Sequence, residues 1–218
     1  RRARTGATAT HTAPDDDSFT LAEPRSTRPF WILRVTLAVL AGVLPPVHFP
    51  HLPTLAPAAM PDVEAARTFA SFAAAGLAST VIGGVLADRI SPAAQLGIAM
   101  SLLAAGTIVI ALATGSTSAH VGMATHGIAH GLATATIAPT LARYFGRAHH
   151  GAIRGMSGAV GVAGSAGGPW ALSVVADSGG GFDVALLMLG LSTAVVAVSA
   201  FALRRPRRSL PGREGSGT

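Results

Sequence analysis

The sequence contains no cysteine and no lysine, and only 12% of its 218 residues are charged. The absence of cysteine excludes disulfides, thiol nucleophiles and cysteine-ligated metals. The absence of lysine excludes the Walker A phosphate-binding motif and enzymes that form a Schiff base through a lysine. Half of the residues are hydrophobic and the mean hydropathy is +0.50, which is typical of a chain that lies in lipid.

Six long apolar segments account for this hydropathy. They cover residues 30–59, 65–87, 93–113, 119–142, 151–176 and 184–203. A helix rises ~1.5 Å per residue, so about 20 residues cross the hydrocarbon core of a bilayer. The sequence therefore predicts an all-α membrane protein with six transmembrane helices. The lipid bilayer is one of its expected partners.

The basic residues are distributed unevenly along these segments. All sixteen are arginines, and fifteen of them lie before the first segment or at its start, after the last segment, or at the turns that follow the second and fourth segments. Arginine accumulates in cytoplasmic loops, so we expect a multi-pass protein of the plasma (inner) membrane with both termini in the cytoplasm. The outside turns are then near 60–66, 114–118 and 177–183, and only Arg67 lies on that side.

The formal charge of +6 does not indicate nucleic-acid binding, because the arginines gather at segment ends and form no basic stripe with interleaved aromatic residues. Anionic lipid headgroups are the expected counter-charge. Residues 1–29 are polar and lack apolar periodicity, which predicts a disordered cytoplasmic segment. It is either a floppy terminus or a linker to further chain upstream, and we favour the linker. Residues 30–203 form the predicted helical bundle, and residues 204–218 a basic cytoplasmic tail.

The composition of the six segments repeats with a period of three. The first and fourth hold the histidines and most prolines, the second and fifth are rich in small residues, and the third and sixth are uniformly apolar, as in helices that face lipid. Because three crossings are an odd number, this order predicts two three-helix repeats of inverted topology, as in secondary transporters. In the fifth segment, Gly151 with Gly155 and Gly164 with Gly168 have the four-residue spacing that favours close helix packing.

Three stretches of the sequence resemble the major facilitator superfamily. Residues 84–89, Gly-Val-Leu-Ala-Asp-Arg, are similar to its loop signature, and residues 138–147 and 151–155 with Gly168-Pro169 are similar to its tenth and eleventh helices. The closest resemblance is to monocarboxylate-like and oxalate:formate-like carriers. It implies the C-terminal six-helix half of a twelve-helix carrier, whose partner is the N-terminal half of the same carrier.

The loop signature suggests a cytoplasmic gate made of Gly84, Asp88, Arg89 and Arg143. An acid at the inner end of a membrane helix needs a basic partner or a helix N-terminus, and Arg143 is our candidate for Asp88. In carriers of the resembled family such pairs break and reform during transport. The alternative is that Asp88 only caps a solvated loop.

Histidines are the candidates for a substrate or proton pathway. His126 and His130 share one helix face, and His48 and His51 lie beside Pro45, Pro46 and Pro50, which should kink or unwind the first helix. Intramembrane histidines are candidate functional groups that change charge near neutral pH. They could also only hydrogen-bond across helices, and His48 or His51 could lie at the outer rim. Arg67 is either a carboxylate clamp or a rim residue, and we favour the rim.

These observations predict a secondary transporter half that moves a small organic solute by alternating access, with a carboxylate substrate and proton coupling as candidate properties. We expect no catalysis, no cofactor and no metal, because no carboxylate or cysteine stands at ligand spacing from the histidines. One alternative is a non-transporting six-helix membrane module. Another is a rhomboid-like serine protease built on Ser157, which lacks a histidine base after residue 150.

Overall fold

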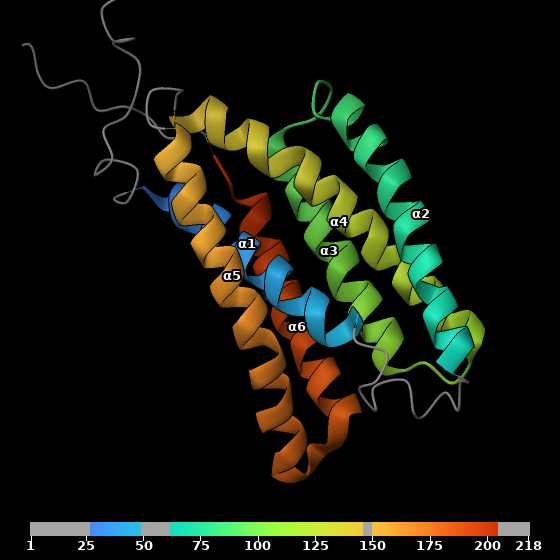
Figure 1. The fold of residues 1–218 in the computed structure, drawn as a ribbon. Coiled ribbons are helices and arrows are strands. Elements are labelled where there is room, and N and C mark those ends of the chain that lie inside the picture. The colour runs from blue at the N-terminus through green and yellow to red at the C-terminus, as the bar shows by residue number, and fades with distance from the viewer. Residues whose placement is uncertain (1–26, 49–61, 146–149, 205–218) are drawn as a thin grey trace, which may run out of the picture.

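The computed structural model describes residues 27–48, 62–145 and 150–204, and these residues are helical apart from short turns. The helices are α1 (Arg28–His48), α2 (Asp62–Leu86), α3 (Pro92–Ala111), α4 (Ser116–Phe145), α5 (His150–Val175) and α6 (Gly181–Phe201), with a π-helical turn, η3 (Ala176–Gly180), before α6. Figure 1 shows the start of α1 and the end of α6 at the same end of the bundle. The predicted linker and most of the basic tail lie outside the described residues.

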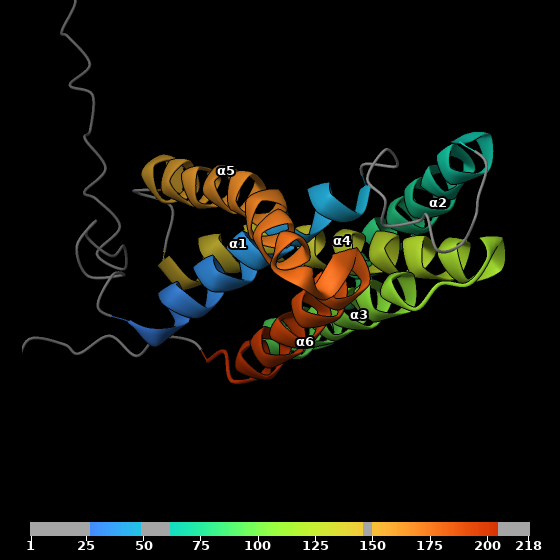
Figure 2. The same ribbon diagram turned by 90° about the horizontal axis from the view of Figure 1, so that it is seen from below.

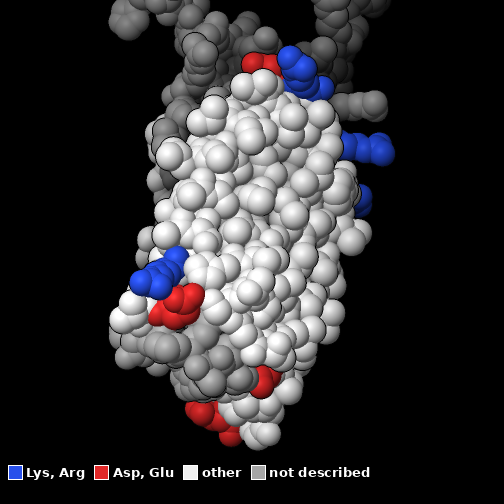
Figure 3. All heavy atoms as spheres, turned by 90° about the vertical axis from the view of Figure 1, so that its right-hand side faces the viewer, with Lys and Arg blue, Asp and Glu red and all other residues white. Residues whose placement is uncertain are grey.

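Four stretches are long and apolar enough to cross a membrane, namely Arg28–His48, Ala66–Leu86, Pro92–Ala111 and Gly155–Phe201. The last of these contains most of α5 and all of α6. The helix α4 is not among them, because histidine and threonine side chains dilute its apolar residues. Figure 3 shows a broad uncharged band on the α2 side of the molecule, with acidic and basic side chains gathered toward its two ends. The all-helical chain is thus suited to lipid.

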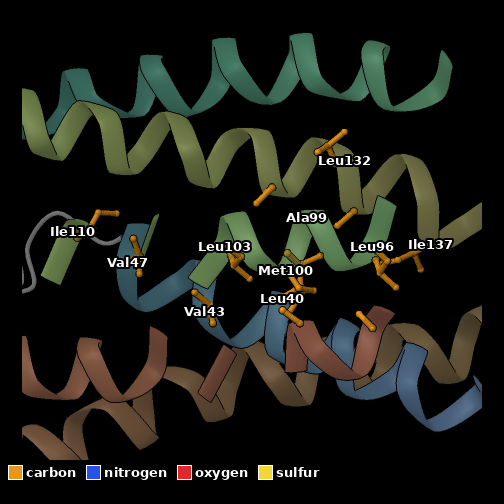
Figure 4. Packing of buried hydrophobic residues seen from close by; sticks show 14 of the residues in the cluster. Leu40, Val43, Val47, Leu96, Ala99, Met100, Leu103, Ile110, Leu132 and Ile137 are labelled. Atoms are coloured by element: carbon orange, nitrogen blue, oxygen red, sulfur yellow. The ribbon is translucent and has the colours of Figure 1, made fainter. Parts of the chain in front are cut away.

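The helices pack in pairs. The helix α1 lies against α5, α2 lies against α4, and α3 contacts both α4 and α6. Seen along the bundle in Figure 2, α2 and α5 occupy two outer corners, while α3 and α6 lie together on the opposite side. The core is formed by buried residues of α1, α3, α4 and α6, with Leu40 and Val43 facing Met100 and Leu103 (Figure 4).

The third segment faces lipid over less of its surface than we expected, because α3 is the most buried of the candidate spans. In α3, 56% of the apolar stretch is buried, against 11% in α2. Leu96, Met100 and Leu103 are fully enclosed, and so are the polar side chains of Gln95 and Thr107. A helix that is apolar on all sides suits a protein interior as well as lipid, so composition alone did not separate the two cases.

Glycines bring α5 against α1. A Cβ atom built on Gly164 would meet the carbonyl oxygen of Ala38, and one built on Gly168 would meet the carbonyl oxygen of Gly42. That oxygen has no i+4 amide donor, because residue 46 is a proline. The two helices therefore touch backbone to backbone. Gly151 and Gly155, which have the same spacing, have no atom within 4 Å of the built Cβ position, so the described chain offers them no packing partner.

A second glycine contact brings α2 against α4. Cβ atoms on Gly127 and Gly131 would meet Phe72 and Ser79 of α2. The hydroxyl of Ser79 lies between two carbonyl oxygens, 3.1 Å from that of Gly76 in its own helix and 3.3 Å from that of Gly127 in α4. Our reading of the sequence missed this crossing, although the two glycines have the four-residue spacing that we noted in the fifth segment.

The first helix continues through Pro45 and Pro46 and reaches His48. The prolines therefore do not unwind the helix before His48 in the described residues. Residues 49–61, with Pro50 and His51, lie outside the described part of the chain.

Candidate functional site

Three of the predicted histidines come together between α1, α2 and α4. The ring of His48, the last residue of α1, lies 4.2 Å from the ring of Phe72 and 6.0 Å from that of His126, measured between centroids. Phe72 also lies 5.8 Å from His130, and Phe69 lies 5.8 Å from His48. These five side chains, which we call the imidazole cluster, join one end of α1 to the middle of α4 through two phenyl rings of α2.

His126 is fully buried and its orientation is set by α3. Its Nε2 atom lies 3.0 Å from Oγ1 of Thr107, whose hydroxyl donates to the carbonyl oxygen of Leu103 at 2.8 Å. Because the single hydroxyl proton is used there, we assign Nε2 as the donor and Nδ1 as an unprotonated acceptor. Gly106 makes room for the ring, since a Cβ atom at that position would lie 2.5 Å from Cδ2 of His126.

Two ring nitrogens of the cluster have no hydrogen-bond partner among the described residues. They are Nδ1 of His126 and Nε2 of His48, and both atoms are shielded from solvent. Buried polar groups are normally hydrogen-bonded, and an unpaired one costs free energy. A water, a proton or a solute that reaches the cluster would satisfy them. This arrangement can therefore accept a hydrogen bond or a proton inside the bundle.

Arg67 lies apart from the imidazole cluster in an outer polar network. Its side chain is 70% exposed, and its Nη1 atom lies 3.3 Å from Oε2 of Glu64 on the same helix. Ser116 donates to Oε1 of Glu64 at 2.7 Å, and His120 bridges from Glu64 (3.5 Å) to Ser71 (2.8 Å). This geometry suits the rim position that we favoured for Arg67.

The network also determines the electrostatics of Glu64. The hydrogen bond from Ser116 lowers the pKa of this carboxyl below its usual value, with further contributions from His120 and Arg67. Glu64 therefore stays ionised and ties the start of α2 to the start of α4. Our sequence analysis did not single out this carboxylate, because ion pairs between two helix ends appear only once the helices are placed.

The predicted gate residues lie at the opposite end of the bundle. The Nη2 atom of Arg143 is 3.7 Å from Oδ1 of Asp88, so the structure brings together the two residues that we paired. Both side chains are exposed, and an ion pair of this kind contributes about 0–1 kcal/mol. Gly84 and Arg89 are also exposed, and nothing lies within 4 Å of a Cβ built on Gly84. The pair is weak enough to open and close.

Arg34 is a buried charge that sequence reasoning did not select. Its Nη1 atom donates to the carbonyl oxygen of Met156 at 3.1 Å, and its guanidinium lies 4.0 Å above the ring of Phe30. The contact ties the start of α1 to α5. The signal in the sequence is an arginine at the start of the first apolar segment, and its position there groups it with the cytoplasmic charge.

The remaining candidates can be placed briefly. Ser157, the serine of the protease alternative, is buried in α5. Within the described ranges, no three histidine, aspartate or glutamate side chains gather as a metal site requires.

No curated protein matches the chain. The family profile described as Major Facilitator Superfamily matches residues 32–217, which is nearly all of the predicted bundle and tail. The match agrees with the resemblance to this superfamily that we saw in the sequence. It does not extend to a particular branch of carriers or to the C-terminal half of one. The apolar helices and the buried polar cluster agree with this match. The chain therefore belongs to the Major Facilitator Superfamily and is an integral membrane protein of the transporter type.

Proposed function

We propose that the chain is the C-terminal six-helix half of a secondary active transporter. It moves a small organic solute across the plasma membrane by alternating access, with both termini in the cytoplasm. The observation that carries the proposal is the imidazole cluster, in which two shielded ring nitrogens with no hydrogen-bond partner in the described part of the chain lie between the helices. Ionisable side chains at such positions mark substrate or proton pathways.

The packing of the helices supports two inverted three-helix repeats. A two-fold axis that exchanges α1 with α4, α2 with α5 and α3 with α6 converts the α1–α5 contact into the α4–α2 contact, and both contacts are present. Both also use glycines, Gly164 and Gly168 at one crossing and Gly127 and Gly131 at the other. The α3–α6 contact maps onto itself, as such an axis requires.

The partner that we propose is an N-terminal six-helix half. The helix α2 is the least buried of the spans, and its outward face presents Leu77, Val81 and Val85. The outward face of α5 presents Val162 and Trp170, both about 70% exposed. Figure 2 shows α2 and α5 as the two corners away from α3 and α6. A second bundle that packs against these corners would enclose α1 and α4, and with them the imidazole cluster.

The chemistry of the cluster favours an anionic solute and proton coupling. The cluster contains three imidazoles, and the family resemblance points to carboxylates. A protonated imidazole attracts a carboxylate, and a neutral imidazole has an unprotonated ring nitrogen that can take a co-transported proton. Phe69 and Phe72 supply an apolar wall for the carbon skeleton of the solute.

The first test concerns the partner half. We expect uptake only when residues 1–218 are joined to, or produced together with, an N-terminal six-helix half, because the substrate route lies between two halves. The measurement is uptake of radiolabelled formate, lactate and oxalate into liposomes, with and without an imposed proton gradient. The isolated fragment, shown to be monodisperse, is the control. Transport by that fragment alone would contradict the proposal, and no uptake by a folded, joined carrier would favour the non-transporting module.

The second test concerns the gate pair. We propose that the contact between Asp88 and Arg143 opens and closes during the transport cycle. Asp88→Arg should reduce the uptake rate of the joined carrier by about tenfold, because two guanidinium groups then repel each other. The double variant Asp88→Arg with Arg143→Asp should recover most of the rate. If the double variant is as slow as the single one, Asp88 acts as a loop cap and not through Arg143.

A further inference from the structure

A third glycine crossing sets α3 against α4 beside His126. A Cβ atom on Gly122 of α4 would lie 3.3 Å from the carbonyl oxygen of Gly106, and one on Gly106 would lie 3.1 Å from the carbonyl oxygen of Gly122. Thr107 follows Gly106 in the chain, and His126 lies one turn after Gly122. The crossing therefore brings the hydroxyl oxygen of Thr107 within 3.0 Å of Nε2 of His126.

The two edges of the His126 ring have different surroundings. One edge carries Cδ2 and Nε2 and faces α3, with Cδ2 against Gly106 and Nε2 against Thr107. Because Nδ1 and Cδ2 flank Cγ on opposite sides of an imidazole ring, Nδ1 is turned away from α3. This nitrogen is shielded from solvent and has no hydrogen-bond partner among the described residues. The ring of His48 in α1 lies 6.0 Å from the His126 ring, between centroids.

The hydrogen bonds of Thr107 make Nε2 a closed end for protons. The hydroxyl donates its single proton to the carbonyl oxygen of Leu103 at 2.8 Å, so its oxygen can only accept from Nε2–H. To release that proton, the ring would need Thr107 to pass its own proton to Leu103, and backbone carbonyls are not among the groups that titrate in proteins. The helix α3 has no ionisable side chain along its whole length that could receive the proton instead.

We propose that Thr107 is a positioning residue of the imidazole cluster, which keeps a proton on Nε2 of His126 so that this ring takes up and releases a proton at Nδ1 alone. The inference rests on the proposed function, in which the cluster accepts the co-transported proton. That proton comes from water or from the protonated ring of His48, forms an N–H bond at Nδ1, and leaves when the same bond breaks. His126 is then the end of the proton route and not a relay toward α3.

Few other ionisable groups surround His126 in the described part of the chain. The helix α1 contributes His48, and α4 itself contributes His130, which lies one turn further along. The ionisable residues of α2 lie in its first two turns, where Glu64 and Arg67 belong to the outer network. A pH effect at Nδ1 should therefore depend on the three imidazoles of the cluster.

Nuclear magnetic resonance of the 218-residue chain in lipid nanodiscs can test where the proton lies. The histidine nitrogens are isotope-labelled, and the signals of His126 are identified by their loss in His126→Gln. In the neutral ring we expect Nε2 to be protonated and Nδ1 to be unprotonated. The Nε2 proton should exchange with heavy water about tenfold faster in Thr107→Val, which lacks the hydroxyl, and at an unchanged rate in Thr107→Ser, which retains it.

Two results of this experiment would overturn the proposal. One is a neutral ring with its proton on Nδ1, because Thr107 would then donate to Nε2. The other is an Nε2 proton that exchanges equally fast in Thr107→Val and in the unchanged chain, because the hydroxyl would then not hold it.

The second measurement is the pH dependence of uptake by the joined carrier. The hydrogen bond to Thr107 stabilises the charged ring more than the neutral one, so Thr107→Val should shift the midpoint of the profile by about 0.5–1 pH unit to lower pH. Thr107→Ser should keep the original profile. An unchanged profile in Thr107→Val would also overturn the proposal. If the joined carrier takes up no solute while the resonance results are as expected, the proposed transport function fails and the role of Thr107 at His126 stands.

Discussion

Gly168→Ala is expected to destabilise the chain by about 1–3 kcal/mol, as overpacking of a close contact does. A Cβ atom at this position would lie 2.6 Å from the carbonyl carbon of Gly42 and 2.8 Å from its Cα atom. Both are backbone atoms, so α1 and α5 must move apart to admit it. The measurement is thermal unfolding of the purified 218-residue chain in detergent, where Tm should fall by several degrees.

The neighbouring residue is the control. Gly167→Ala places a methyl group where nothing lies within 4 Å, and alanine is favoured over glycine in a helix by about 1 kcal/mol. Tm should therefore stay the same or rise. In the second crossing, Gly131→Ala should act like Gly168→Ala, because its methyl group would lie 2.5 Å from the carbonyl oxygen of Gly76. Equal Tm values for Gly167→Ala and Gly168→Ala would show that the helices do not touch at Gly42.

His126→Ala together with His130→Ala is expected to reduce the uptake rate of the joined carrier by at least about tenfold and to remove its pH dependence between pH 5 and 8. Imidazole is the side chain that changes charge in this range. The double variant leaves His48 as the single imidazole of the cluster, without its neighbour at 6.0 Å. Initial uptake rates at several external pH values, at fixed membrane potential, measure the effect.

His120→Ala is the matched control for this experiment. His120 lies on the same helix, α4, but it belongs to the outer network with Glu64 and Ser71. Its removal should leave the pH profile unchanged. If the profile of the His126 and His130 double variant equals that of the unchanged carrier, both residues serve only in packing, and Thr107 is then the hydrogen-bond partner that explains the burial of His126.

The sequence predicted the helices well because their signals are local. The bounds of the five helices α2 to α6 differ from the expected segments by three residues or fewer, since apolar runs and the turns between them are read along the chain. The pairing of Asp88 with Arg143 was also predictable, because Asp88 lies in the turn after α2 and Arg143 in the last turn of α4, on the side where arginine accumulates. The burial of α3 was not, because uniformly apolar helices suit lipid and protein interiors alike.

The candidate site shows the same division. Spacing alone placed His126 and His130 on one helix face, but it did not show that Phe72 lies between His130 and His48. It also did not separate Gly164 and Gly168, which touch α1, from Gly151 and Gly155, which touch nothing in the described chain. Four residues of separation describe a helix face, whereas a contact depends on which other helix lies opposite that face.

The sequence by itself determined that this chain is a helical membrane protein of the Major Facilitator Superfamily, because hydrophobic length, arginine distribution and short motifs are properties of the chain in one dimension. The tertiary structure alone decided which helices are buried, which glycines form crossings and which ring nitrogens lie shielded in the imidazole cluster. The physical reason is that an apolar side chain is equally stable in lipid on every helix. Only close packing between particular backbones distinguishes one arrangement of these helices from another.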